Sequence, residues 1–344
     1  MSLQARRVFR LALTTALTLV LVYALSLTFA FMAPLFAFML TLNPAPPMGA
    51  KRLLVLVILV AVTTGVGLLL VPLLMYFAPA AVVVVLLGLY LSFYLTIYKQ
   101  QPALGTFVAI GFTVISATSL YDFSLGKMLV ESFLSGIVIA IVCQWLVYPL
   151  FPEDSQAAGQ KDQEAPPVDA EASRWIAIRG TLIVLPVYLL ALNNPSLFVA
   201  AIMKSVTLGQ QTSHIDIAHA GRELLGSTFL AACFAMAVWM GLRILPNLWM
   251  YFLLMLLTAI FVASKIYGAL PTRYPTSFWS NVMTTQLILL GPAIADIASS
   301  KDVYMASFVR LSLFVVISLY AWWMVALLDT WRHRRRNAIT LKNS

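Results

Sequence analysis

Long apolar runs dominate the chain and alternate with short polar or basic connections. The run over 53–77 can cross a bilayer alone, because about 20 apolar residues in a helix span the hydrocarbon core of about 30 Å. The short alternating segments typical of an outer-membrane barrel are missing. The pattern predicts an all-α polytopic membrane protein with about twelve transmembrane helices. The predicted spans are 8–27, 29–42, 52–77, 79–98, 103–120, 125–150, 174–192, 195–209, 215–241, 246–266, 275–296 and 303–330.

A polar stretch at 152–173 separates the first six predicted spans from the last six. It is acidic, rich in Pro and Ala, and has no apolar periodicity, so we expect a flexible linker. The predicted organisation is a six-helix unit over 1–151, this linker, a second six-helix unit over 174–331, and a basic tail over 332–344.

Lysine and arginine gather on one side of the predicted spans. By the positive-inside rule, this bias places both termini and the linker in the cytoplasm. We expect the protein to lie in the inner membrane of a bacterial cell. A cleaved signal peptide over 1–30 would leave an odd number of spans and put the basic loops on the wrong side, so we treat the first run as a transmembrane helix.

The two groups of spans resemble each other in the placement of their polar residues. This correspondence predicts two like-oriented six-helix repeats, related by an axis along the membrane normal, an arrangement typical of transporters. The matched positions are Arg10 with Arg179, Arg52 with Arg222, Lys99 with Arg273, and Asp122 with Asp296.

Composition restricts the function classes. The chain is 61% hydrophobic and 10% charged with a mean hydropathy of +0.92, which excludes an ordinary soluble domain. Its net charge of +9 lies at the predicted inner ends and implies no nucleic acid. Cys143 and Cys233 lie in apolar runs, and we expect no metal site and no cofactor. No phosphate loop or G-x-S-x-G motif is found, so we expect no enzyme activity. Because no nucleotide-binding loop is present in the sequence, we expect any transport to be coupled to the proton gradient.

Spans two and eight are too short to cross the hydrocarbon core. Short or Pro-interrupted helices at membrane depth must lie against protein or a water-filled cavity, and such pairs point to a transport site. Span eight carries Lys204 within the apolar segment FVAAIMKSV. Two interpretations stay open for Lys204: a side chain that reaches back to the cytoplasmic interface, or a cation facing a cavity where it binds an anionic substrate.

Ionisable residues are concentrated in HIDIAHAGRE at 214–223, at the start of span nine. Asp216, His219 and Glu223 fall on one helical stripe. The cluster is a solvated helix start that suits the helix dipole, a proton-coupling or gating site, or a metal site, although it lacks a strong metal-ligand signature.

Three further features are candidates for the pathway. Arg310 lies well inside span twelve, either in a structural pair or on the pathway, because a membrane-embedded arginine is costly unless it is paired or hydrated. Ser277, Asn281 and either Thr284 or Thr285 form a polar stripe on span eleven that either joins helices or lines the route. Arg179 is a weaker candidate for attracting an anion.

The layout resembles the fusaric acid resistance-like family, which includes the aromatic acid exporters of bacterial inner membranes. The resemblance rests on RRVFRLALTTALTLVLVYAL near the N-terminus, a short second span ending in a Pro-rich turn, an Arg-led third span and the duplicated halves. It implies proton-driven export of small, often aromatic or amphipathic acids, together with a periplasmic membrane-fusion adaptor and an outer-membrane channel. The chain departs from the larger exporters, since only 152–173 stands where they carry a cytoplasmic domain.

The sequence therefore predicts an efflux transporter subunit in which Lys204, Arg179 and Arg310 attract a small organic anion. Ser277, Asn281 and Thr284 would line the route, while Asp216, His219 and Glu223 would handle protons. The rival interpretations are a passive anion channel and a scaffold or assembly subunit that transports nothing. Formation of a homo-oligomer is left open.

Overall fold

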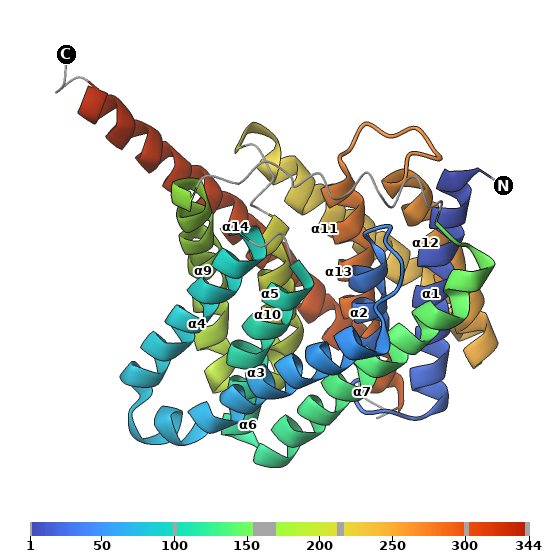
Figure 1. Cartoon of the computed structure of the whole chain (residues 1–344). Helices are drawn as coiled ribbons and strands as arrows, with labels where there is room; N and C mark the ends of the chain where they lie inside the picture. The colour runs from blue at the N-terminus through green and yellow to red at the C-terminus, as the bar shows by residue number, and fades with distance from the viewer. Residues whose placement is uncertain (1, 99–101, 154–169, 212–216, 299–302, 341–344) are drawn as a thin grey trace.

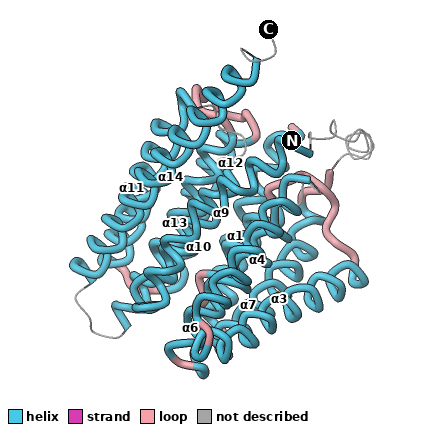
Figure 2. Tube along the Cα trace, turned by 90° about the vertical axis from the view of Figure 1, so that its left-hand side faces the viewer, coloured by secondary structure: helices cyan, strands magenta, loops and turns pink. Residues whose placement is uncertain are grey.

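The computed structural model describes residues 2–98, 102–153, 170–211, 217–298 and 303–340, and these residues fold into helices and connecting loops (Figures 1 and 2). The helices of the first unit are α1 (Leu3–Ala24), α2 (Met32–Thr41), α3 (Ala50–Tyr76), α4 (Ala78–Tyr98), α5 (Pro102–Ile110), the π-helical turn η1 (Gly111–Ile115), α6 (Ser116–Tyr121), α7 (Phe123–Val147) and the 3₁₀ turn η2 (Tyr148–Leu150). Those of the second unit are α9 (Ala170–Asn193), α10 (Pro195–Gln211), α11 (Ile217–Ile244), α12 (Leu248–Ile266), α13 (Thr276–Ala298) and α14 (Val303–Thr340).

Each of the twelve predicted spans corresponds to a helix, with α5, η1 and α6 together forming the fifth. Among the described residues, nine helices are long and apolar enough to cross a membrane, and α2 and α10 are shorter apolar helices. The prediction of a multi-pass helical membrane protein is therefore confirmed. The boundaries differ at three places: α1 begins at Leu3, α9 begins at Ala170 inside the predicted linker, and α14 continues to Thr340.

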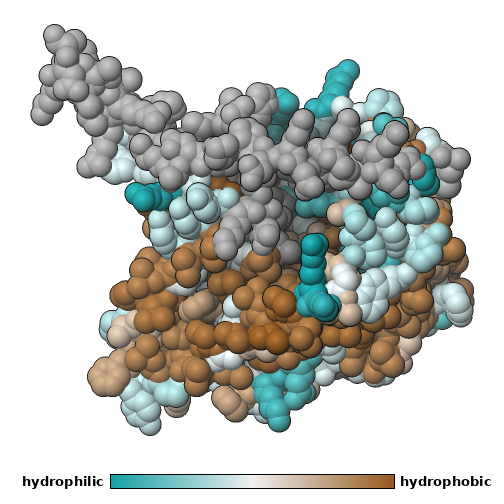
Figure 3. Space-filling view, in the orientation of Figure 1, coloured by the Kyte–Doolittle hydropathy of each residue, from teal (hydrophilic) through white to brown (hydrophobic). Residues whose placement is uncertain are grey.

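Large apolar side chains cover the sides of the helix bundle. Residues such as Leu69 on α3, Phe229 on α11 and Val316 on α14 are 78%, 70% and 59% exposed. Figure 3 shows such side chains as a band across the visible face, with hydrophilic groups above and below it. A surface of this kind is stable against lipid rather than water. The start of α1 and the end of α14 lie toward the same end of the bundle (Figure 1).

The two short helices lie inside the protein. Every residue from Phe31 to Phe38 is buried or nearly so, and α2 packs against α1, α7 and α13. Residues 200–209 of α10 are likewise all buried, and this helix packs against α9, α13 and α14. The expectation that helices too short for the bilayer lie against protein is met in both cases, because neighbouring helices shield their ends from lipid.

Contacts between the two units follow a reciprocal pattern. The first helix of each unit packs against the fourth helix of the other, so that α1 lies along α12 and α9 lies along α4. The short helices contact the fifth helix of the opposite unit, α2 with α13 and α10 with α5. The two units therefore enclose a common interior around α2 and α10.

Candidate functional site

Lys204 lies in the interior of the described structure. Asn194 precedes α10, and its side-chain oxygen accepts a 3.3 Å hydrogen bond from the backbone of Leu197, which begins the helix at this point. Ten residues later the Lys204 side chain is 0% exposed. It therefore does not reach the interface, and the first of the two interpretations of this lysine is wrong.

The amino group of Lys204 is bound by two side chains of α13. Its Nζ donates to Oδ1 of Asn281 at 2.8 Å and to Oγ1 of Thr285 at 2.6 Å. Asn281 and Thr285 are four residues apart, so one face of α13 presents both oxygens to α10. Thr285 also donates to Oδ1 of Asn281 at 3.2 Å.

The polar network continues from α13 to α11. Asn281 Nδ2 donates to Oγ of Ser227 at 2.5 Å, and Ser227 in turn donates to the backbone carbonyl of Glu223. Ser277 donates to Oε2 of Glu223 at 3.4 Å. The chain of contacts therefore leads from a fully buried cation to the backbone of Glu223 near the start of α11, and Ser277 contacts the half-buried carboxylate of the same residue.

The acceptors that the structure shows for Lys204 are neutral oxygens. Within the described residues, no ion pair to Lys204 is formed. A buried cation held only by neutral dipoles keeps a net positive field in a medium of low dielectric, where charges interact more strongly than in water. Such a centre can bind an anion, and it can also release its proton.

One residue of the predicted stripe points elsewhere. Thr284 donates to the backbone carbonyls of Ser280 at 3.0 Å and Asn281 at 3.2 Å, so its hydroxyl serves its own helix. Both Thr284 and Thr285 fit the helical spacing, and the structure brings Thr285 to Lys204. Of the two threonines, the structure therefore places Thr285, and not Thr284, at Lys204.

The other two predicted cations lie on helices other than α10 and α13. Arg179 is buried on α9 with 5% exposure. Arg310 is half-buried on α14 and lines a separate cavity between α11, α13 and α14, whose lining does not include Lys204. The structure thus joins Lys204 to Asn281 but does not place Lys204 and Arg310 in one cavity.

The predicted proton-handling cluster is described only in part. Asp216 lies outside the described residues, and so does the side chain of His219, although its backbone belongs to α11. Glu223 is half-buried and contacts Ser277, a second predicted residue.

A charged clamp that the sequence did not reveal lies at the end of the first unit. Glu153 accepts hydrogen bonds from Arg7 and, at 2.9 Å, from Nη2 of Arg10, while Arg6 donates to the carbonyl of Pro152 at 3.1 Å. The Glu153 side chain is 2% exposed. Burial alone would raise the pKa of this carboxyl, but the two arginines outweigh it and hold the pKa below its usual value. The first residues of the predicted flexible linker are therefore fixed to α1.

Two further polar residues were missed. Ser227 on α11 is fully buried and connects Asn281 to Glu223. Gln286 on α13 is fully buried and donates to Oγ1 of Thr258 on α12 at 3.1 Å. Gln286 directly follows Thr285 and so points to a different neighbour, α12, and a polar amide in an apolar run was the signal that could have identified it.

Comparison with known proteins adds a family match for the first unit. Residues 7–147 match the model of a family described as a protein of unknown function (DUF2955). No curated protein and no solved structure matches the chain. The matched range ends with α7, the description of this family names no activity, and the comparisons return no member of the fusaric acid resistance-like family.

Proposed function

We propose that this protein is an inner-membrane transporter subunit that exports small organic anions, aromatic or amphipathic, and that Lys204 binds the anion. The supporting observation is the fully buried Lys204 amino group, held by Asn281 and Thr285 in the protein interior. Burying a lysine among neutral partners is costly, and intramembrane ionisable residues commonly mark substrate or proton pathways.

The packing supports two like-oriented repeats. Equivalent helices make equivalent contacts in each unit, and the two contacts between a first and a fourth helix are reciprocal. The corresponding pairs are α1–α2 with α9–α10, α2–α7 with α10–α14, α1–α7 with α9–α14, α3–α4 with α11–α12, α3–α7 with α11–α14, and α1–α12 with α9–α4. Parallel repeats that enclose a common interior suit a pathway along their shared axis.

Export would be driven by protons in this proposal. The hydrogen-bond chain from Lys204 reaches the backbone carbonyl of Glu223 through Ser227, and Asp216 and His219 belong to the same part of the sequence. An anion that binds beside the charged lysine would bury an ion pair instead of a lone charge. The resemblance to aromatic acid exporters supports a periplasmic membrane-fusion adaptor and an outer-membrane channel as partners, and cytoplasmic termini.

The test is transport of radiolabelled benzoate by the purified full-length protein in proteoliposomes, with and without an imposed pH gradient. We expect gradient-driven movement in the wild type, loss of at least tenfold in Lys204→Met, and partial rescue by Lys204→Arg, which keeps the charge. Lys127→Met serves as control, because the Lys127 side chain is 70% exposed and its partner Glu131 lies 4.0 Å away.

Each rival function gives a different result in this assay. A passive channel would move benzoate at a rate unaffected by the pH gradient. A scaffold would move none in any variant. Unchanged transport by Lys204→Met at equal protein level would remove Lys204 from the site.

A further inference from the structure

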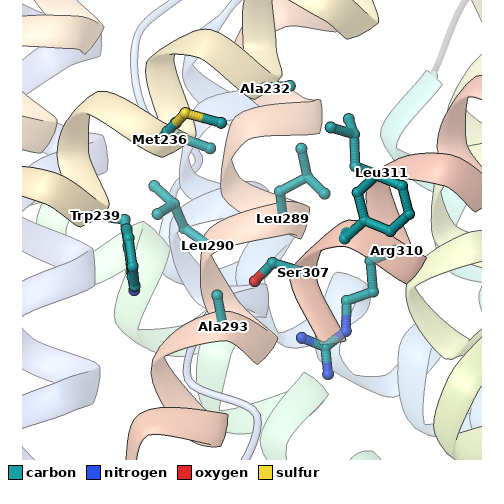
Figure 4. A pocket seen from close by; sticks show the side chains of 11 residues that line it. Ala232, Met236, Trp239, Leu289, Leu290, Ala293, Ser307, Arg310 and Leu311 are labelled. Atoms are coloured by element: carbon teal, nitrogen blue, oxygen red, sulfur yellow. The ribbon is translucent and has the colours of Figure 1, made fainter. Parts of the chain in front are cut away.

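A cavity of about 380 Å³ lies between α11, α13 and α14 (Figure 4). Its volume falls at the lower end of the range for small-molecule pockets, about 300–1,000 Å³. Most of the lining is apolar, and its unbranched and branched aliphatic side chains include Met236, Leu289, Leu290 and Leu311. A cavity of this size and lining suits a single hydrocarbon chain or ring system.

Two polar groups of the lining lie on opposite sides of it. In Figure 4 the indole nitrogen of Trp239 lies at the left, and the guanidinium of Arg310 lies at the lower right, below Leu289 and Leu311. A second cation lies beside Trp239, since the guanidinium of Arg243 stacks over the Trp239 ring at 5.2 Å. The cavity is therefore amphipathic, with an apolar body and an end that is complementary to a carboxylate.

The rim of the cavity faces the membrane. Met236 on α11 is 57% exposed and Phe308 on α14 is 67% exposed, and both line the cavity. Large exposed apolar side chains of these two helices belong to the surface that contacts lipid. A ligand dissolved in the bilayer can therefore enter sideways between α11 and α14.

The matching helices of the first unit are packed much more closely. A Cβ atom added to Gly67 of α3 would lie 2.1 Å from the carbonyl oxygen of Gly111 in η1, and one added to Gly111 would lie 2.6 Å from the carbonyl oxygen of Thr63. The backbones of α3 and η1 thus touch, whereas α11, α13 and α14 leave room for a ligand.

We propose that this cavity binds an amphipathic carboxylate with a single apolar chain, taken up from the bilayer, with its carboxylate at Arg310 and its chain among Met236, Leu289 and Leu311. The small volume and the single cationic end favour one free acid over a diacyl lipid. The site is separate from Lys204, so it stands whether or not Lys204 carries transport.

The test is equilibrium binding of decanoate and of decanol to the purified full-length protein, measured by displacement of a fluorescent fatty acid. We expect the wild type to bind decanoate about tenfold more tightly than decanol, because only the carboxylate can form a charge-assisted hydrogen bond with arginine. Arg310→Gln should remove this preference, and Arg310→Lys should keep part of it. Ala235→Phe should fill the cavity and abolish binding of both compounds.

Two control variants separate the cavity from general effects. Val316→Phe introduces the same side chain at a lipid-exposed position of α14, and Arg273→Gln removes an exposed arginine, so both should bind as the wild type does. Arg310→Gln and Ala235→Phe leave Lys204 in place, so their effect on decanoate binding reports on this cavity, whereas benzoate transport by Lys204→Met reports on the transport proposal.

Three results would overturn the proposal. The first is equal affinity of the wild type for decanoate and decanol. The second is unchanged binding of both compounds by folded Ala235→Phe. The third is a diacyl phospholipid that copurifies with the wild type but not with Ala235→Phe. The wild-type comparison of decanoate with decanol needs no variant, so it decides the matter even if the arginine variants do not fold.

Discussion

Lys204 Nζ donates a 2.8 Å hydrogen bond to Asn281 Oδ1, which joins the short helix α10 to α13 in the protein interior. Asn281 is 1% exposed and Lys204 is 0% exposed, so neither group exchanges this contact for water. The pair lies within a network that reaches α11 through Ser227. Asn281 is uncharged and does not neutralise Lys204, and the first prediction depends on the charge of this lysine.

We expect Asn281→Asp to abolish anion transport while preserving or raising the thermal stability of the protein. The carboxylate would stand where the amide oxygen now lies and would form an ion pair with Lys204, which neutralises the field that attracts a substrate. Benzoate transport in proteoliposomes and the melting temperature in detergent measure the two effects.

Asn281→Leu is the matched control for this variant. It removes an acceptor without adding charge and should lower stability by about 1–3 kcal/mol, because a buried donor loses its partner. If Asn281→Asp transports benzoate as fast as the wild type, the charge of Lys204 is not what binds the anion.

Much of the fold could be predicted from hydrophobicity alone. The apolar runs define each helix, because the bilayer requires about 20 apolar residues for each crossing. The short runs around Phe36 and Lys204 indicated interior helices, and both helices are buried. Helical periodicity also shows which positions share one face of a helix, and it placed Asn281 on a polar stripe.

Contacts between distant segments could not be predicted in this way. Nothing in the runs around Arg10 and Glu153 indicates that their side chains meet, because 143 residues separate them. Ser227 was missed because the sequence does not show whether the hydroxyl of a serine in an apolar run contacts another helix or bonds only to its own helix. Arg310 was assigned to the Lys204 site because it is cationic and membrane-embedded, and charge alone does not reveal which cavity it lines.

The close approach of α3 to η1 makes a second prediction. Gly67→Ala should lower stability by more than about 1 kcal/mol, because its methyl group would overlap the carbonyl oxygen of Gly111 and force the helices apart. Gly65→Ala is the control: nothing lies within 4 Å of its added methyl group, and alanine favours the helix by about 1 kcal/mol over glycine. Chemical unfolding in mixed micelles compares the two variants, and equal destabilisation by both would contradict this packing.

The clamp on Glu153 makes a third prediction, on pH. Because the folded state holds the pKa of this carboxyl below its usual value, its contribution to stability is present above the unfolded pKa and is lost as pH falls through the folded pKa. Glu153→Gln should therefore destabilise the protein at pH 7, by about 3–5 kcal/mol if the arginines stay buried without a counter-ion. The difference from the wild type should shrink in acid.

Melting temperatures of both proteins between pH 7 and pH 3 measure this change. Glu131→Gln is the control. The Glu131 side chain is 65% exposed and lies 4.0 Å from the exposed Lys127, and an exposed ion pair of this kind contributes little to stability. A gap between wild type and Glu153→Gln that stays constant over this range would show that the ionised carboxylate does not hold the clamp.

Two adjacent threonines of α13 provide the sharpest test of the Lys204 network. Thr285 Oγ1 accepts a 2.6 Å hydrogen bond from the lysine, whereas Thr284 donates only to backbone carbonyls of its own helix. Thr285→Val leaves the lysine with one acceptor fewer, and we expect benzoate transport to fall about tenfold, since a hydrogen bond to a charged group contributes about 1.5–3 kcal/mol. Thr284→Val has the same change in shape and should transport as the wild type does. The opposite order of the two variants would mean that Thr284 lines the route and that Lys204 holds α10 to α13 without binding substrate.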